Sequence, residues 1–435
     1  MMNETRPALP RYVPHMSAGR ETAGATGTFR NAQGIDLPRR TKILHVIHLT
    51  NPESGGPIEA VLRFSEVLVR EGHEVEVVSL ESAEETARRS FPCKVTGLGR
   101  GRGKYGYNPR LACWVNQNAP RFDVVILHGL WNYSSFGGWR GLRKQSTPYY
   151  IFPHGMMDPW FRQQSFLKHL AKQAYWWLAE GRVLRDADRV LFTCEEEKIR
   201  AHNAFFGWPY NGCVAGLGTA DPEGDANAER AAFAAVFPFL KRKRFFLFLS
   251  RIHPKKGCDL LIQAFADLVT ETPPDLDLVI AGPDQTGWVP ELQQLAGRLG
   301  IAGRVHWPGM LKGELKWGAF RSADALILPS HQENFGFVVA ESLGCSTPVL
   351  ISDKVNIWRE VKSFEAGLVE SDTLEGTRNL IQKFLALSSD ELAKMKLASR
   401  RAFLEQFSAE AATHDLLRLI NSTSVERPGR RDRGD

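Results

Sequence analysis

Residues 42–80 read KILHVIHLTNPESGGPIEAVLRFSEVLVREGHEVEVVSL, and this stretch decides the fold class. It opens with an apolar run, 42–49, that is typical of a strand buried on both faces. A glycine-rich loop follows at 50–57, then an amphipathic helical pattern at 58–72 and a second strand pattern at 73–80. The order strand, helix, strand predicts a βαβ unit with two parallel strands.

The same rhythm continues along the chain in two further series of apolar runs. Each run ends in a polar or glycine-containing turn, which is typical of parallel strands whose carboxyl ends carry function. The first series is at 122–129, 148–155 and 187–194, and the second is at 245–251, 276–283, 304–309, 323–330 and 347–353. We therefore predict an α/β protein with two doubly wound, Rossmann-like parallel-sheet domains.

A stretch rich in Gly, Ala and Asp separates the two series around residues 216–230. Both ends of the chain lack hydrophobic periodicity, so we expect them to be flexible. The expected parts are a leader at 1–40, an N-terminal domain at 41–225, a C-terminal domain at 226–404, a helix at 405–422 that completes the N-terminal domain, and a tail at 423–435.

The formal charge of +6 over 435 residues is concentrated at the chain ends. Residues 1–40 contain six Arg against three acidic residues, and residues 425–435 contain four Arg against three. Little excess charge is left for the domains, and no nucleic-acid-binding motif is visible. We therefore expect no nucleic-acid partner.

The cysteines and the apolar segments indicate a reducing compartment. The six Cys are scattered without a C-x-x-C pair, and the N-terminus shows no apolar signal-peptide core. No stretch approaches the roughly 18 to 20 apolar residues needed to cross a bilayer. We expect a cytoplasmic protein whose contact with a membrane is at most peripheral.

Two stretches of the second series carry candidate site residues. In FFLFLSRIHPKKG, Arg251 follows a strand and Lys255 and Lys256 precede a helix, which suits an anion site, although these residues alone favour a solvated basic turn. In ADALILPSHQENFGFVVAESLGCSTPVL, Glu333 and Glu341 are eight residues apart across a helix start. They suit two parts of an extended ligand, or else a helix-terminus charge and a surface acid.

The combination of SRIHPKKG, AGP and PSHQENFGFVVAESLGCSTPVL resembles the retaining nucleotide-sugar glycosyltransferases of family 4. These enzymes have the GT-B fold, in which two Rossmann-like domains face each other across a cleft. Glu333 and Glu341 match the E-x7-E pattern of that family, and the resemblance extends from residue 42 to about residue 410.

The resemblance implies a role for each matching residue of the C-terminal domain. Glu341 would bind the ribose hydroxyls, and Glu333 would face the donor sugar. Arg251 and Lys256 would hold the diphosphate and stabilise its departure. Main-chain groups would complete the donor site, from Asn334, Phe335 and Gly336 beside the sugar and from the turn at 307–310, including Gly309, beside the base.

In the N-terminal domain, Gly55 and Gly56 match the glycine-rich first loop of the family, where a close approach to the diphosphate excludes a Cβ; an ordinary turn is the alternative. His154 in PHGMMDPW would lie near the donor sugar and bond a hydroxyl or orient the reacting groups, but a buried structural histidine is an alternative. His128 and Asp158 also point toward the cleft, or else simply end a strand and form a turn.

The family resemblance implies a metal-independent retaining transfer without a cofactor. The acceptor hydroxyl would attack on the face from which the diphosphate leaves and pass its proton to the departing oxygen. Arg251, Lys256 and a helix dipole would replace a divalent cation. Asp186 and Asp188 are then surface residues and not metal ligands, so we expect no metal site.

The HGMMDPW loop looks most like bacterial enzymes of exopolysaccharide, capsule or O-antigen synthesis. That narrower resemblance implies a polyprenyl-diphosphate-linked saccharide acceptor and a donor such as GDP-mannose or a UDP-hexose. Residues 160–185 combine aromatic and basic side chains with a single acid, which suits docking on the inner face of the cytoplasmic membrane or, alternatively, internal packing.

Three other functions fit the sequence less well. The first is transfer to a soluble sugar acceptor, which is the main competitor. The second is a non-catalytic assembly partner that binds nucleotide sugars, but such a protein would have lost part of the catalytic set. The third is a dinucleotide-dependent oxidoreductase, which would have G-x-G-x-x-G after the first strand and an acid after the second; NPESGGPIEAV lacks that spacing.

Overall fold

The computed structural model describes residues 29–30, 36–37, 40–159, 166–202, 204–241, 243–268 and 275–425. Residues 1–40 and 41–435 are two separate units. In the first unit, β1 (Phe29–Arg30) pairs antiparallel with β2 (Asp36–Leu37). The rest of the expected leader, apart from Arg40, and residues 426–435 of the expected tail lie outside the described residues.

The first sheet of the second unit has seven parallel strands in the order β5-β4-β3-β6-β7-β8-β9. Its strands are rich in Val, Ile and Leu because helices cover both faces and leave no solvent-exposed side. The strands are β3 (Lys42–Ile47), β4 (Glu74–Ser79), β5 (Lys94–Gly97), β6 (Val124–His128), β7 (Tyr149–Phe152), β8 (Arg189–Phe192) and β9 (Gly212–Val214).

Helix α1 (Gly56–Arg70) supplies the crossover of the predicted βαβ unit. Ile58, Val61, Phe64 and Leu68 recur at helical spacing and are buried against the sheet. The other helices of this part are α2 (Ala83–Ala87), α3 (Pro109–Asn118), α4 (Tyr133–Leu142), α6 (Phe166–Tyr175), α7 (Gly181–Asp186) and α8 (Glu195–Ala201), with 3₁₀ turns η1 (Pro52–Ser54) and η2 (Ala119–Arg121) and the π-helical segment η3 (Trp176–Glu180).

The second sheet has six parallel strands in the order β12-β11-β10-β13-β14-β15. They are β10 (Arg244–Leu249), β11 (Leu276–Ala281), β12 (Val305–Gly309), β13 (Ala325–Leu328), β14 (Val349–Ser352) and β15 (Gly367–Glu370). Three edge strands were not predicted, β5, β9 and β15, because each is short and only partly buried. The two-sheet Rossmann-like fold class is confirmed.

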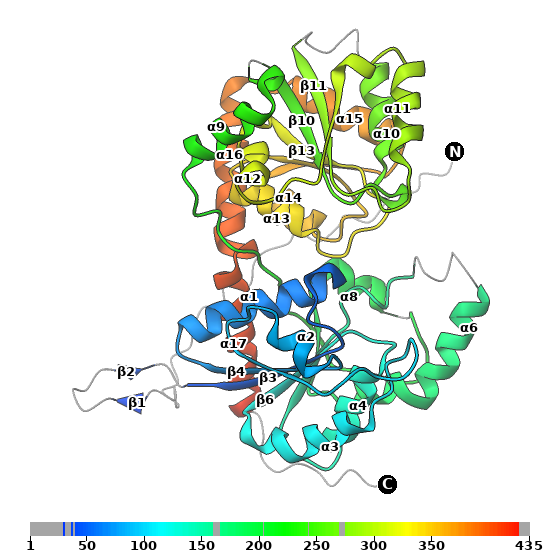
Figure 1. Cartoon of the computed structure of the whole chain (residues 1–435), viewed down its shortest axis with the longest axis vertical. Coiled ribbons are helices and arrows are strands. Elements are labelled where there is room, and N and C mark those ends of the chain that lie inside the picture. The colour runs from blue at the N-terminus through cyan, green and yellow to red at the C-terminus, as the bar shows by residue number, and fades with distance from the viewer. Residues whose placement is uncertain are drawn as a thin grey trace, which may run out of the picture. The chain divides into compact units, whose positions relative to one another are not determined.

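Helices cover both faces of the second sheet. Figure 1 shows α10 and α11 on one side of β10 and β11, and α9 and α12 on the other. The helices and turns are α9 (Ala226–Val236), η4 (Pro238–Leu240), η5 (Pro254–Lys256), α10 (Cys258–Asp267), α11 (Val289–Arg298), η6 (Ala302–Arg304), α12 (Gly313–Ser322), α13 (Phe337–Gly344), α14 (Trp358–Ser363), α15 (Leu374–Leu385) and α16 (Ser389–Ala402).

The chain ends in η7 (Phe403–Phe407) and α17 (Ala409–Val425). Helix α17 lies against α1, through an ion pair of 2.5 Å between Arg70 and Glu410 and a contact of 2.8 Å between His414 and Glu71. It thus contacts the first sheet's helices, although it follows the second sheet in sequence. The residues at which the domains divide stay a prediction.

Candidate active site

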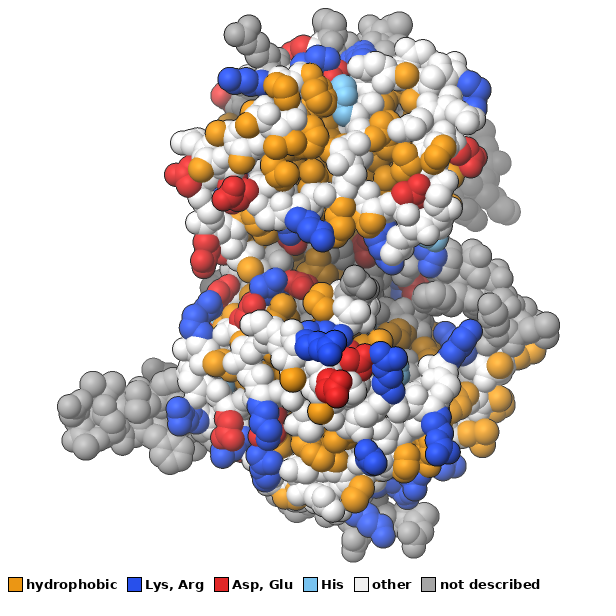
Figure 2. Space-filling view, in the orientation of Figure 1, with side chains coloured by type: hydrophobic (Ala, Val, Ile, Leu, Met, Phe, Trp, Pro, Cys, Tyr) orange, Lys and Arg blue, Asp and Glu red, His pale blue; other side chains and the backbone are white. Residues whose placement is uncertain are grey.

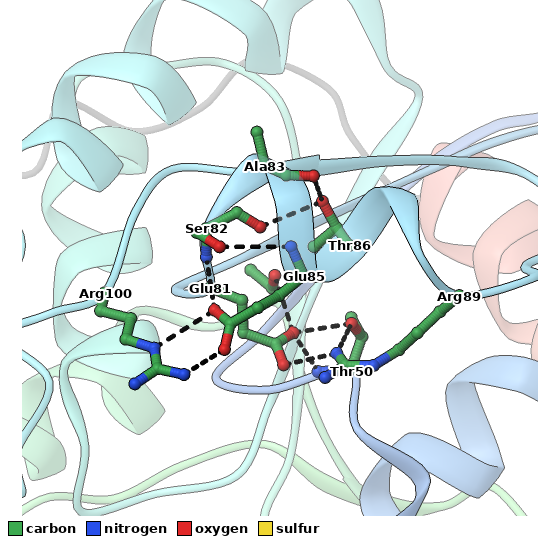
Figure 3. A network of polar contacts seen from close by, with 9 residues as sticks. Thr50, Glu81, Ser82, Ala83, Glu85, Thr86, Arg89 and Arg100 are labelled. Carbon is green, nitrogen blue, oxygen red and sulfur yellow. Dashed lines mark hydrogen bonds and ion pairs between the residues drawn. The ribbon is translucent and has the colours of Figure 1, made fainter.

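An acid from the neighbouring strand holds the start of the loop between β3 and α1. Glu81 follows β4 and accepts hydrogen bonds from the amide and the hydroxyl of Thr50, both at 2.6 Å. Arg89 lies 2.5 Å from the other carboxylate oxygen. Figure 3 shows Thr50, Glu81 and Arg89 together in this network. Burial acts to raise the pKa of Glu81, but the bonds from Thr50 and Arg89 outweigh it and lower that pKa. Both carboxylate oxygens are therefore engaged, unlike the ribose-binding acid of a dinucleotide-binding domain.

The two glycines of this loop lie at its approach to the second sheet's helices. Gly55 has a φ of 93°, a left-handed conformation that favours glycine. A Cβ on Gly56 would lie 3.4 Å from the ring of Phe337, the first residue of α13. The predicted glycine-rich loop is thus in contact with the helix that carries Glu341.

Lys256 and Glu333 form an ion pair beyond the carboxyl ends of β10 and β13. Lys256 ends turn η5 and is only 5% exposed. Turn η5 closes tightly because Gly257 has a φ of 67°, and a Cβ there would lie 2.3 Å from the carbonyl oxygen of Pro329. Glycine therefore fixes the position of Lys256 beside β13.

Arg251 follows β10 and so lies at the same end of the sheet as Lys256, but it is exposed. Its guanidinium donates to the Gln285 side chain at 3.3 Å. The turn around it is positively charged. Burial lowers the pKa of His253 and of Lys255, and the nearby charges of Arg251 and Lys256 lower both further. A group of like charges held this close together suits a polyanionic ligand such as a diphosphate.

Glu341 lies on α13 and is paired with Lys316 of α12 at 2.9 Å. Its side chain is 15% exposed, so the surface-acid interpretation of Glu341 is wrong. Burial raises the pKa of Glu341, and the Lys316 ammonium partly offsets this effect. Among the described contacts, each acid of the E-x7-E pattern thus has its own lysine partner. Glu333, just before α13, pairs with Lys256, and Glu341, within α13, pairs with Lys316.

The residues between the two acids set the position of the α13 N-terminus. Gly336 caps α13 with a φ of 75°. Phe335 is buried against Phe337 and Phe407, with ring centroids 5.0 and 6.1 Å apart, so its side chain packs and only its main chain is available to a ligand. The Asn334 side chain donates to the Thr193 hydroxyl at 3.2 Å.

The His154 loop lies directly against Asn334. His154 follows β7 with a φ of 51°, which is uncommon for a residue with a side chain. A Cβ on Gly155 would lie 2.7 Å from Cγ of Asn334. The buried Glu197 carboxylate accepts from the Gly155 amide at 2.5 Å and from the amide and hydroxyl of Thr193, both at 2.7 Å. The structure therefore brings the His154 loop and the Glu333 loop together through Glu197 and Thr193.

Other candidates lie outside this group. Gly309 ends β12 with a φ of 73°, and its carbonyl accepts from the Gly282 amide at 2.8 Å, with no described contact to the Lys256 pair. Asp158 is buried beside Arg200, 3.6 Å away. Asp186 accepts from the Trp139 indole at 2.9 Å and Asp188 from the Tyr149 amide at 3.0 Å. These last two are half-buried structural acids and not the surface residues predicted.

Three residues of the site could not be found from the sequence. Lys316, Glu197 and Glu81 act through partners that are remote in the sequence or on other elements. Glu197 stands in a run of three Glu, which by itself indicates only the start of a helix. No sequence signal marks Lys316.

The segment 160–185 divides between packing and exposure. Residues 160–165 and the side chains of 166–168 lie outside the described part. Trp176 is fully buried, whereas Trp177 and Leu178 are 52% and 69% exposed. Figure 2 shows hydrophobic side chains along the right edge, at α6 and the segment after it. In the described part of the chain, no helix is long and apolar enough to cross a membrane.

Two Rossmann-like sheets, with the Lys256–Glu333 pair beyond strand ends of the second and a glycine-rich loop after β3 of the first, have the arrangement of the GT-B glycosyltransferases. Comparisons with known proteins agree. Residues 55–218 match the family described as glycosyl transferase 4-like domain, and residues 229–402 match glycosyl transferases group 1. Together the two matches span most of the chain, which therefore belongs to these glycosyltransferase families, as its motifs predicted. The narrower likeness to exopolysaccharide enzymes stays a prediction.

Relatives and solved structures cover nearly the whole chain. The D-inositol 3-phosphate glycosyltransferase of Rhodococcus jostii is 26% identical over 93% of each chain, and that of Gordonia bronchialis is 27% identical over 90% of this chain and 91% of its own. Anabaena HepE, solved with UDP and glucose, aligns with a TM-score of 0.68 at 17% identity over 88% of this chain and all of its own. Sucrose-phosphate synthase from Thermosynechococcus elongatus aligns with a TM-score of 0.66 at 18% identity, over 89% and 100%.

Proposed function

We propose that this glycosyltransferase moves a hexosyl group from a nucleoside-diphosphate sugar to an acceptor hydroxyl with retention of configuration. The observation that carries the proposal is the ion pair of the buried Lys256 with Glu333, beside the His154 loop. A fixed cation and an acid, with the loop that carries His154 lying against Asn334, support a donor site near the start of α13. The solved structures of HepE with UDP and with UDP-glucose support a nucleotide-sugar donor.

In the proposed donor complex, the diphosphate lies between Arg251 and Lys256, and Glu341 accepts hydrogen bonds from the ribose hydroxyls. Glu333 then exchanges part of its bond to Lys256 for the donor sugar. The bond between the anomeric carbon and the phosphate oxygen breaks on the face where the acceptor oxygen bonds. The acceptor proton passes to the departing phosphate oxygen, so the reaction balances without an added base.

The proposal requires no metal ion, because Arg251 and Lys256 stabilise the negative charge that develops on the leaving diphosphate. Fixed cations in a site that excludes water interact with developing charge far more strongly than the same groups do in water. Lys256 meets this condition because it is buried before any ligand arrives. Its position needs no rearrangement during the reaction.

The donor base is best decided by binding. We propose a UDP-hexose or GDP-mannose, with the base near the turn at 307–310, which includes Gly309. Thermal-shift measurements with UDP-glucose, UDP-galactose, UDP-N-acetylglucosamine, GDP-mannose and GDP-fucose test this directly. One donor is expected to raise the melting temperature, and Glu341→Gln is expected to abolish that shift. A shift of equal size in the Glu341→Gln protein would contradict the proposed ribose contact.

For the acceptor, we propose a saccharide linked to a polyprenyl diphosphate at the inner face of the cytoplasmic membrane. Support comes from four exposed apolar side chains on and near α6: Leu170, Trp177, Leu178 and Phe206. The guanidinium groups of Arg182 and Arg185 lie nearby, 5.9 and 4.6 Å from the Trp208 ring. Apolar side chains flanked by cations suit the interface of an anionic bilayer.

Vesicle binding tests this docking. Trp177→Ser with Leu178→Ser should lower co-sedimentation with anionic vesicles by about tenfold. Leu397→Ser is the matched control, because Leu397 is 74% exposed but lies on α16. Equal binding by the wild type, the double variant and the control would contradict membrane docking.

A soluble anionic acceptor is the second candidate, and a specific feature favours it. A hollow of about 380 Å³ beyond β5 is lined by Arg100, Arg102 and Arg110 together with Tyr107. The curated relatives are named for D-inositol 3-phosphate, a phosphorylated soluble polyol. Transfer assays with inositol 3-phosphate and with a polyprenyl-diphosphate saccharide, run in parallel, separate the two acceptors.

A further inference from the structure

Three histidines from neighbouring strands form a continuous chain of ring contacts that ends at the candidate site. His45 lies within β3, His128 ends β6, and His154 follows β7. Nδ1 of His45 is 2.9 Å from Nε2 of His128, and Nδ1 of His128 is 3.0 Å from Nε2 of His154. These three residues are called the histidine relay below.

The relay is packed among the strands of the seven-stranded sheet. His45 and His128 are buried, and the ring of Phe152 stacks on His128 at 5.6 Å and on His154 at 5.4 Å. Burial lowers the pKa of His45 and of His154 to about 3, and burial with the neighbouring imidazoles lowers that of His128 well below its usual value. All three rings are therefore neutral at physiological pH, and each carries one N–H. Within the described residues, no group of side chains is arranged to hold a metal ion there.

Counting ring protons leaves two arrangements. In the first, His45 donates from Nδ1 to His128, His128 donates from Nδ1 to His154, and His154 keeps its own proton on Nδ1. In the second, every proton is on Nε2 and every bond runs in the opposite direction. The two arrangements differ at the buried end of the relay, at Nε2 of His45.

Nε2 of His45 is buried and has no hydrogen-bond partner among the described residues. The first arrangement leaves a lone pair there, whereas the second leaves an N–H without an acceptor. Buried N–H groups without a partner are rarer than acceptors without one, because a donor loses its only hydrogen bond. The unpartnered nitrogen therefore selects the first arrangement.

We propose that His45 and His128 are positioning residues that hold His154 in its Nδ1–H tautomer, so that His154 meets the donor as a neutral hydrogen-bond donor and not as a base. This inference rests on the proposed function for its ligand, an oxygen of the donor sugar or its phosphate. In the described contacts, Nδ1 of His154 has no protein partner, while Nε2 accepts from His128. A second proton on Nε2 of His154 would require both bonds of the relay to reverse.

Nitrogen NMR of the ¹⁵N-histidine-labelled full chain tests the tautomer without any substrate. Two-bond proton–nitrogen correlations distinguish a protonated ring nitrogen from an unprotonated one. We expect Nδ1 to be protonated and Nε2 unprotonated in all three relay histidines. A proton on Nε2 of His154, alone or together with one on Nδ1, would overturn the proposal.

Two substitutions at the buried end of the relay test its effect on catalysis. His45→Asn keeps an N–H near the position of Nδ1, whereas His45→Leu removes it. Relative to wild type, we expect kcat to fall about tenfold in His45→Leu and less than threefold in His45→Asn, with donor KM little changed in both. His202→Leu, at an exposed histidine outside the relay, is the control and should have wild-type kcat.

Equal losses in His45→Leu and His45→Asn would show a packing role only and would overturn the proposal. If neither variant folds, the NMR measurement on the unsubstituted protein still decides it. If no nucleotide sugar is turned over, the proposed function fails, but the ring tautomers remain measurable in the free protein. The two failures are thus distinguishable.

Discussion

Replacing Lys256 with Met removes the buried charge of the Lys256–Glu333 pair while keeping most of the side-chain volume. In the wild type, the Lys256 side chain is 6% exposed and that of Glu333 is 23% exposed. Breaking a fully buried ion pair costs about 3–5 kcal/mol, but water reaches Glu333, so we expect a loss of about 1–2 kcal/mol in unfolding free energy. The effect on catalysis should be larger, because the proposed role of Lys256 is to stabilise the leaving diphosphate.

Removing a fixed group that stabilises transition-state charge typically costs about 2.7–4 kcal/mol, which is a fall of about 10²–10³ in kcat. Donor KM should change less than fivefold, because most of the contact with Lys256 develops only as the diphosphate leaves. The assay measures release of nucleoside diphosphate against donor concentration. Lys255→Met is the matched control, since it removes the same charge from the same turn, and its kcat should fall less than fivefold.

Combining Lys256→Met with Glu333→Gln separates stability from catalysis. The double variant removes both charges, so it should recover most of the unfolding free energy lost in Lys256→Met. Its kcat should stay as low as that of Lys256→Met or fall further. Recovery of kcat together with stability, or a rise in KM without a change in kcat, would refute the proposed role of Lys256.

Further predictions concern the ribose contact, a buried acid, a turn glycine and metal dependence. Glu341→Gln should raise donor KM by roughly 10–100-fold and change kcat by less than threefold. The reason is that a hydrogen bond to a charged group contributes about 1.5–3 kcal/mol in the ground state and the transition state alike. A fall in kcat alone would count against a ribose contact. Burial raises the pKa of Glu180 from 4.5 to about 7, so its contribution to stability is full below pH 4.5 and is lost as the pH rises through 7. The unfolding free energy of Glu180→Gln, measured by chemical denaturation, should therefore rise relative to that of the wild type by up to about 3 kcal/mol between pH 5 and pH 8. A difference between the two proteins that does not change with pH would contradict this. Gly257→Ala should lower the unfolding free energy by about 2–4 kcal/mol, because Gly257 has a left-handed φ and a Cβ there would clash with backbone. Gly300→Ala should lower it by only about 1 kcal/mol, because Gly300 has a φ of 73° but open space around it. Activity should survive EDTA, and loss of activity that Mg²⁺ or Mn²⁺ restores would show that the transfer needs a metal.

The fold class was predictable because its signals are local. Continuous apolar runs and helical periodicity identify the buried parallel strands and helices such as α1. β15 escaped prediction because an edge strand that is half-buried does not require an apolar run. In the π-helical segment after α6, adjacent Trp176 and Trp177 have opposite environments, because successive side chains of a helix point in different directions. The sequence does not show which face of this helical segment packs against the rest of the protein.

The site was only partly predictable, because its motif residues have partners on remote elements. The spacing of Glu333 and Glu341 placed one acid just before α13 and the other further along it, but neither lysine partner follows from that spacing. Glu197 links the His154 loop to the second sheet through Thr193, and no short motif encodes such a contact. His45 lies inside a strand and appeared only as part of an apolar run.

The central claim is that this glycosyltransferase turns over a nucleotide sugar at the Lys256–Glu333 pair. The most direct measurement is release of nucleoside diphosphate from a panel of UDP- and GDP-sugars, with anionic vesicles present, by the wild type and by Lys256→Met. We predict slow release from one donor by the wild type, and at least a hundredfold slower release by the variant. Equal release by both proteins, or no release from any donor, would contradict the claim.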